Sequence, residues 1–153
     1  MSKVRKVNPQ DLEALKIVID TNELFPSELL EDMMKDYFNN PDTQDIWLTT
    51  EFNDIPIAVA YCAPEKLTEG TYNLYLIAIH KNHQGKGIGT AIMNNVENLL
   101  KTKNVRVLLV ETSGLAEFEL TRKFYDQCNY HREALIRDFY REGEDKIVFW
   151  KKL

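Results

Sequence analysis

Apolar and polar side chains follow two different periods along this chain, and the changes of period divide it into strands and helices. Alternating positions or short β-branched runs indicate strands, whereas apolar positions three and four apart indicate amphipathic helices. After a short opening strand, the pattern predicts further strands at 46–52, 55–63, 71–79, 105–110, 132–139 and 146–151. It predicts helices that begin after Asn8, at Pro26, near Ile88 and near Phe118.

Local signals at the ends of these segments support the division. Asn8-Pro9 combines a helix N-cap with a proline at the first helical position. Asn53-Asp54 separates two strand patterns and tolerates positive φ, as a hairpin turn requires. The clearest apolar stripe belongs to the third helix, with Ile88, Ile92, Val96, Leu99 and Leu100.

The order of the predicted elements limits the fold. It runs strand, two helices, three strands, helix, strand, helix and two strands. Consecutive hairpin strands with one helical crossover imply a mixed, mostly antiparallel sheet flanked by helices, rather than a doubly wound parallel sheet. No linker, repeat or low-complexity segment interrupts the pattern, so we expect a single α+β domain over residues 1–153, built in three layers.

The junction between the strand at 71–79 and the helix near Ile88 is rich in glycine. It reads Gln84-Gly85-Lys86-Gly87-Ile88-Gly89-Thr90. Gly87 and Gly89 lack a Cβ, which lets the backbone approach a phosphate, and the first helical N–H groups have no intrahelical partner. The helix dipole adds positive potential at this end. The junction therefore predicts a pyrophosphate site, with Thr90 as a further hydroxyl donor.

Two common phosphate loops do not fit this junction. A Walker loop requires Gly-Lys followed by Ser or Thr, and the dinucleotide fingerprint requires G-x-G-x-x-G. Here the three glycines stand at every second position, and Thr90 follows Gly89 directly. A phosphoryl-transfer protein would also need Mg²⁺ ligands after the loop, where the helix supplies only Asn94, Asn95 and Glu97.

The pattern Gln84-x-x-Gly87-x-Gly89 resembles the [Q/R]-x-x-G-x-[G/A] signature of the GCN5-related N-acetyltransferases. The predicted order of elements is also that of the acetyltransferase fold, so the resemblance covers nearly the entire chain. It implies an enzyme that uses acetyl-coenzyme A as acyl donor and holds its pyrophosphate at the turn, with no metal. The residues expected to bind the donor are Ile77, Ile79, Gln84, Gly85, Lys86, Gly87, Ile88, Gly89, Thr90 and Phe124.

Segment 122–130 resembles a second family signature, a helix that ends in an aromatic-Tyr pair before the last strands. The resemblance implies that Tyr125 is the general acid that protonates the departing thiolate. Packing of Tyr125 in the core is the structural alternative. The family usually has glycine where this chain has Asn129, and Asn is the best non-Gly residue for a left-handed helix cap.

The general base is sought among the carboxylates. Glu111 ends the apolar strand at 105–110 and precedes Tyr125 by fourteen residues, near the place where several family members carry a glutamate base. A solvent-facing or helix-capping role for Glu111 is the alternative. Asn73 stands where other members carry a glutamate, and Asp138 and Tyr140 are weaker candidates for the acceptor side.

Other reactive side chains are expected to have no catalytic role. His80 and His83 lie in a loop and are expected to be solvated. Cys62 and Cys128 show no metal spacing and no activating neighbour, so we interpret them as reduced core thiols.

Composition changes this interpretation little but excludes some partners. With 24 acidic against 19 basic residues and a net charge of −5, the chain lacks the broad basic surface of nucleic-acid-binding proteins. It carries no apolar run of bilayer-spanning length and no signal-peptide pattern, so we expect a cytoplasmic protein without a membrane partner. The acceptor is expected to be a small amine or amino acid. A protein N-terminus or lysine, a non-catalytic acyl-CoA-binding module and a homodimer stay open.

Overall fold

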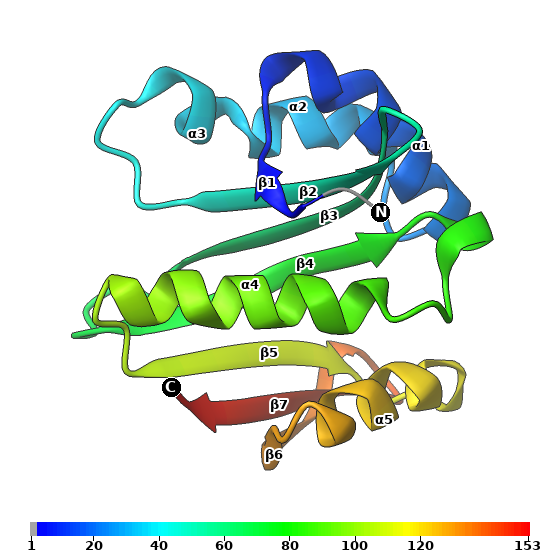
Figure 1. The fold of residues 1–153 in the computed structure, drawn as a ribbon. Helices are drawn as coiled ribbons and strands as arrows, with labels where there is room; N and C mark the ends of the chain where they lie inside the picture. The colour runs from blue at the N-terminus through cyan, green and yellow to red at the C-terminus, as the bar shows by residue number, and fades with distance from the viewer. Residues whose placement is uncertain (1–2) are drawn as a thin grey trace.

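The computed structural model describes residues 3–153, which form a seven-stranded sheet flanked by helices (Figure 1). The strands are β1 (Arg5–Lys6), β2 (Ile46–Phe52), β3 (Ile55–Pro64), β4 (Thr71–Ile79), β5 (Val107–Ser113), β6 (His131–Arg141) and β7 (Glu144–Lys152). The helices are α1 (Leu12–Asn22), α2 (Leu30–Met33), α3 (Lys35–Asn39), α4 (Ile88–Thr102) and α5 (Glu119–Gln127). None of the helices in residues 3–153 is long and apolar enough to span a lipid bilayer.

The sheet has the mixed topology that the sequence predicts. Its strand order is β1-β2-β3-β4-β5-β7-β6, and every neighbouring pair is antiparallel except β4 and β5. Helix α4 forms the crossover between these two parallel strands. The β2–β3 turn has Asn53 at φ 51° and Asp54 at φ 63°, so the positive φ expected there is confirmed.

Two predicted elements differ from the structure. Strand β5 starts at Val107, because the amides of Arg106 and Val107 both bond to the carbonyl of Gly70 in a turn, and it continues to Ser113. Glu111 therefore lies inside a strand, opposite Val148 of β7, and not at a strand end. The helix expected from Pro26 is divided into a 3₁₀ turn, α2 and α3.

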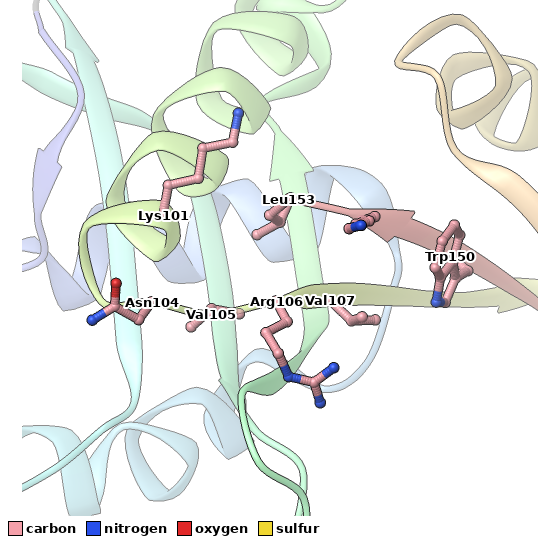
Figure 2. A pocket seen from close by; sticks show the side chains of 8 residues that line it. Lys101, Asn104, Val105, Arg106, Val107, Trp150 and Leu153 are labelled. Carbon is pink, nitrogen blue, oxygen red and sulfur yellow. The ribbon is translucent and has the colours of Figure 1, made fainter.

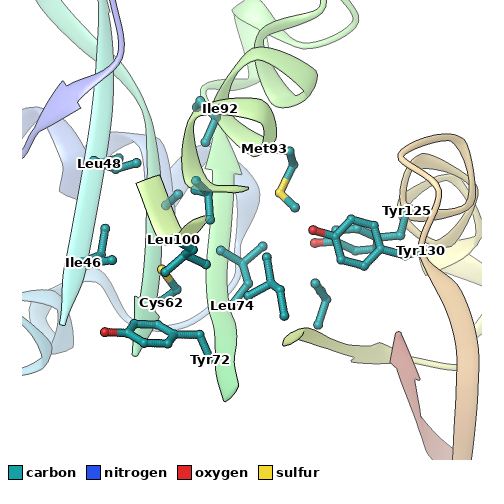
Figure 3. Packing of buried hydrophobic residues seen from close by; sticks show 14 of the residues in the cluster. Ile46, Leu48, Cys62, Tyr72, Leu74, Ile92, Met93, Leu100, Tyr125 and Tyr130 are labelled. Carbon is teal, nitrogen blue, oxygen red and sulfur yellow. The ribbon is translucent and has the colours of Figure 1, made fainter. Parts of the chain in front are cut away.

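Apolar side chains fill both faces of the sheet. Figure 3 shows residues of one of the two clusters, the one that contains Ile92, Leu100 and Tyr125. The larger cluster lies beneath α4 and α5 and includes Ile92, Leu100, Leu108, Tyr125 and Phe149. The smaller cluster lies beneath α1 and α2 and includes Leu15, Ile19, Leu30, Trp47 and Val59. Because α4 and α5 pack on one side and α1–α3 on the other, strands β2, β3 and β4 are held between two layers of helix (Figure 1).

Strands β4 and β5 pair over only four residues. Their last pair is Leu74 with Val110, although both strands continue beyond it. Across β3, Tyr61 pairs with Leu76 and Cys62 with Leu74, so Tyr75 is the extra residue of a β-bulge. A bulge bends its strand and ends regular pairing. The sheet therefore opens into a V between β4 and β5, with Tyr75 and Glu111 as the first residues beyond its apex.

One glutamate is buried within the apolar face of α4. Glu97 is 6% exposed and accepts hydrogen bonds from the Tyr130 hydroxyl at 2.7 Å and the Lys151 ammonium at 2.9 Å. Burial and the Glu97 hydrogen bond raise the pKa of Tyr130. These two donors compensate for the desolvation of the carboxylate and join α4 to the segment after α5 and to β7.

We expect Tyr130→Phe to lower the free energy of unfolding by about 2 kcal/mol, because it leaves one buried carboxylate oxygen without its donor. Urea unfolding followed by circular dichroism measures the change. Tyr140→Phe, at a half-exposed hydroxyl, is the matched control and should leave the midpoint in place. Equal effects of the two substitutions would contradict a structural role for the Tyr130–Glu97 bond.

Candidate active site

The glycine-rich turn has the geometry of an anion cradle. Gly85 and Gly87 have φ values of 74° and 80°, in the left-handed region that favours glycine, and Gly87 is the N-cap of α4. A Cβ added at either position would meet no atom within 4 Å, so the space beside the first turn of α4 is open. The unpaired N–H groups of this turn and the helix dipole make it suitable for a pyrophosphate.

Gly89 lines the cavity beside the turn and also has a packing role. A Cβ there would lie 3.2 Å from Cζ of Phe124, a contact tighter than side chains normally tolerate. The absence of a side chain at Gly89 therefore allows α4 to pack closely against α5.

The Gln84 side chain organises the turn by contacts within the protein. Its amide donates to Oδ1 of Asn22 at 2.9 Å and to the carbonyl of Ile79 at 3.0 Å. Asn22 in turn donates to the same carbonyl at 2.9 Å. The end of α1, the end of β4 and the start of the turn are thus held together, and Asn22 is a site residue that carries no signal in the sequence.

A cavity of about 540 Å³ adjoins the turn. It contains every expected donor-binding residue except Lys86, together with Tyr125 and residues that were not anticipated. Its lining consists of Asn22, Ile77, Ala78, Ile79, His83, Gln84, Gly85, Gly87, Ile88, Gly89, Thr90, Leu120, Thr121, Phe124, Tyr125 and Gln127. Lys86 is exposed and points its ammonium toward the carbonyl of Asn82 at 3.4 Å. The cavity joins an apolar wall from β4 and α5 to the polar cradle, as a molecule with an apolar arm and a pyrophosphate requires.

Tyr125 lies at the protein side of this cavity. It is 3% exposed and packs against Phe149, with ring centroids 5.2 Å apart. Burial raises the pKa of Tyr125 above its ordinary value of 10, so its hydroxyl keeps the proton at neutral pH. Both expectations for this residue, core packing and access to the donor site, are compatible with the geometry.

Glu111 lies on the opposite face of the sheet from Tyr125. The preceding residue, Val110, belongs to the core beneath α4, and successive strand residues point to opposite faces. Glu111 does not line the cavity of the glycine turn. Its Oε1 is 3.1 Å from Nζ of Lys146, and its Oε2 accepts from Nδ2 of Asn73 at 3.2 Å. The carboxylate is therefore held from both sides at the apex of the V.

A second carboxylate, Glu65, is joined to Glu111 through Asn73. Nδ2 of Asn73 also donates to Oε1 of Glu65 at 2.9 Å, and the Tyr75 hydroxyl donates to the same oxygen at 2.8 Å. Burial and the Glu65 hydrogen bond raise the pKa of Tyr75, and the charge of Glu111 raises it further. Glu65 and Tyr75 were missed in the sequence because only the folded sheet brings positions 65, 73, 75 and 111 together.

The weaker acceptor-side candidates are separated by the structure. Asp138 has φ 55° and its carboxylate accepts from the Gly143 amide at 2.9 Å, so it shapes the β6–β7 hairpin. Tyr140 is half-exposed. Burial raises the pKa of Tyr140 first, and the charges of Glu111 and Glu144 add to the effect. The Asp138 carboxylate therefore has a structural role in the turn, whereas Tyr140 lies near enough to Glu111 to be affected by its charge.

The loop histidines are more constrained than expected. Nδ1 of His80 accepts from the Asn82 amide at 3.1 Å and caps a 3₁₀ turn. His83 is half-buried, packs against Phe52 with centroids 5.1 Å apart and lines the cavity. Neither histidine has an acidic partner among the hydrogen bonds described for residues 3–153.

A second cavity, of about 570 Å³, lies at the other end of α4 and includes Lys101, Arg106, Lys152 and Trp150 (Figure 2). In Figure 2 the Lys101 and Arg106 side chains point away from each other, so they do not converge on one anion. Within residues 3–153 no three His, Cys, Asp or Glu side chains are grouped as a metal site requires. The site chemistry is therefore assigned to the cavity at the glycine turn and to the carboxylates beside it.

Comparison with known proteins identifies the family of this chain. The mixed seven-stranded sheet and the glycine turn at the start of α4 define an acyltransferase-like protein. The model of the acetyltransferase (GNAT) family matches residues 14–130, most of the chain, and the chain therefore belongs to this family of N-acetyltransferases.

Individual relatives agree with the family assignment. An uncharacterized N-acetyltransferase of Methanocaldococcus jannaschii is 34% identical over 86 residues, which cover 54% of this chain and 53% of that protein, about half of its length. A protein of Desulfovibrio desulfuricans assigned to the GNAT acetyltransferases superposes with a TM-score of 0.91 at 28% identity, over 97% of each chain. An aminoglycoside 6'-N-acetyltransferase complexed with coenzyme A shares the fold, with a TM-score of 0.78 at 15% identity over 99% of this chain and 97% of that one.

We expect Gly87→Glu to abolish coenzyme A binding, because it places a carboxylate beside the cradle and strains a backbone at φ 80°. Isothermal titration calorimetry with coenzyme A measures the loss. Gly143→Glu is the matched control, since Gly143 has φ 82° and equally open surroundings but lies in the β6–β7 hairpin. Undiminished binding of coenzyme A by Gly87→Glu would show that the glycine turn does not hold the pyrophosphate.

Proposed function

We propose that this chain transfers the acetyl group of acetyl-coenzyme A to the primary amine of a small molecule, by direct attack within a ternary complex. The supporting observation is the V between β4 and β5, with the glycine cradle and Tyr125 on one face of the sheet and Glu111 on the other. A thioester that enters from the cradle side and an amine that enters from the carboxylate side would meet where the two strands separate.

The reaction needs a neutral amine, and Glu111 is the proposed acceptor of the ammonium proton, directly or through one water. The nitrogen then attacks the thioester carbonyl, so that an N–C bond forms. Backbone N–H groups of β4 beyond Leu74 have lost their partners on β5 and can donate to the oxyanion. As the C–S bond breaks, the Tyr125 hydroxyl gives its proton to the thiolate. The nitrogen loses its second proton, which restores the Tyr125 hydroxyl through solvent, so that the amide, the coenzyme A thiol and protonated Glu111 result.

An acyl-enzyme intermediate is disfavoured by the state of the two thiols. Burial raises the pKa of Cys62 to about 12 and also raises the pKa of Cys128, so both remain protonated and weakly nucleophilic at neutral pH. Cys62 is also enclosed in the core beneath α4. Direct transfer between the two substrates requires no such nucleophile.

The acceptor side supports a cationic small amine. Glu65 and Glu111 lie at the apex of the V, linked by Asn73. Two carboxylates favour the approach of an ammonium group by electrostatic attraction. A protein N-terminus or lysine also carries an ammonium group, so peptides belong in the acceptor panel.

The deciding experiment is coenzyme A thiol release from acetyl-coenzyme A with amino acids, polyamines, aminoglycosides and short peptides, alongside calorimetric binding of the donor. Amine-dependent release with a small amine is the expected result. Turnover with peptides alone would indicate that the acceptor is a protein and not a small molecule. Donor binding without any turnover would favour the non-catalytic acyl-CoA-binding module.

We expect Tyr125→Phe to lower kcat about 100-fold with little change in the KM for acetyl-coenzyme A, because proton donation acts in the transition state. Tyr72→Phe is the control. Tyr72 is buried in the same core, and its hydroxyl donates to the Gln44 carbonyl. Because the pKa of Tyr125 is raised, its deprotonation should not limit the wild-type rate below pH 10. An unchanged kcat would exclude Tyr125 as the acid.

We expect Glu111→Gln to lower kcat at pH 7 about 100-fold, because the amide keeps the shape of the side chain but accepts no proton. Part of the rate should return at high pH, where more of the acceptor amine is already neutral. Steady-state kinetics from pH 6 to 10 with one acceptor measures both effects. A kcat equal to the wild-type value over the whole pH range would show that another group is the general base.

A further inference from the structure

Lys146 is the lysine that the fold removes most completely from solvent. Among residues 3–153 it is the only buried lysine, at 8% exposure. It lies on β7 between Asp145 and Ile147, and Ile147 packs toward the core beneath α4 and α5. Strand alternation therefore directs Lys146 to the other face, where Glu111 stands.

Two contacts hold the Lys146 ammonium in place. Nζ is 3.1 Å from Oε1 of Glu111 and 3.7 Å from the centroid of the Phe139 ring on β6. The face of the aromatic ring attracts the ammonium group, and the carboxylate forms an ion pair with it. The second oxygen of Glu111 is held by Asn73 from β4. Three strands thus fix the orientation of one carboxylate.

The surroundings of Glu111 are otherwise acidic or neutral. Glu65 lies beyond Asn73. Burial raises the pKa of Tyr75 and of Tyr140 first, and the charge of Glu111 adds to the rise in both. Lys146 is the one cation that contacts Glu111 in the part of the chain that the structure describes. Without it, repulsion among the carboxylates would favour rotation of Glu111 away from the apex.

Stability alone gives little reason for this arrangement. A buried ion pair gains little over a well-packed apolar pair, because both charges lose their hydration. The chain nevertheless places a buried lysine against the one carboxylate of β5 that lies beside the opening of the sheet. Fixed orientation of a reacting group is the benefit that such a pair provides.

We propose that Lys146 is a positioning residue that holds the Glu111 carboxylate at the apex of the V during acetyl transfer. This inference rests on the proposed function, in which Glu111 takes the proton of the amine. Lys146 itself contacts neither substrate. It would act only through Glu111, and this property distinguishes it from a catalytic residue and from a residue that merely stabilises the sheet.

The first test compares kcat and KM of wild type, Lys146→Met, Lys146→Arg and Lys151→Met with the acceptor found in the panel. We expect Lys146→Met to lower kcat about tenfold with an unchanged KM for acetyl-coenzyme A, and Lys146→Arg to restore most of the rate. Lys151→Met is the matched control, because Lys151 lies on the same strand and pairs with a buried glutamate, Glu97, at 2.9 Å on the opposite face. It should lose stability but not kcat.

The second test is a double-mutant cycle. If Lys146 acts through Glu111, adding Lys146→Met to Glu111→Gln should lower kcat no further. Additive losses, or a kcat for Lys146→Met equal to or above that of wild type, would overturn the proposal. If Glu111→Gln alone kept full activity, Glu111 would not be the general base, and Lys146 would have no positioning role in the reaction.

A cycle of unfolding free energies for the same substitutions needs no activity. It should show coupling between Lys146 and Glu111, and its absence would overturn the proposal even if no acceptor gives turnover. If the unfolding free energies of the two substitutions are coupled but no acceptor gives turnover, the proposed acetyl transfer is wrong and the contact between Lys146 and Glu111 is still supported.

Discussion

The early end of the pairing between β4 and β5 is the constraint on which the rest of the site depends. The two strands share backbone hydrogen bonds only as far as Leu74 and Val110, and a bulge at Tyr75 turns β4 away from its neighbour. Without elements packed over it, an opening in a sheet would expose the apolar core to solvent. Here α4 and α5 fill the far side with apolar side chains, so that the opening exposes a cavity and not the interior.

The two faces of the sheet beside the opening carry groups of different chemistry. The face toward α4 carries the glycine cradle, the dipole of a fifteen-residue helix and a tyrosine whose burial keeps its proton. The opposite face carries carboxylates that are bridged by Asn73 and balanced by Lys146. Under the proposed function, an anionic donor and a cationic acceptor would be attracted to opposite faces of the sheet.

Much of the fold and of the donor side could be predicted from local patterns. The bounds of β4 and the start of α4 agree with the expectation, and Asn129 adopts the left-handed cap predicted for it, at φ 67°. These features depend on residues that are neighbours in sequence, whose conformational preferences are local. The extension of β5 to Ser113 escaped prediction because it depends on pairing with β7, a distant segment of the chain.

The sequence by itself determined the order of elements and the glycine turn, because periodicity and the absence of a Cβ act over a few residues. Only the tertiary structure decided which side chains meet at the apex. Glu65, Asn73, Glu111 and Lys146 come from four separate segments. The register of β4, β5 and β7 and the connection after β3 bring their polar atoms within hydrogen-bond distance. It also decided that Gly89 serves the packing of Phe124, because that contact joins two helices thirty-five positions apart in the chain.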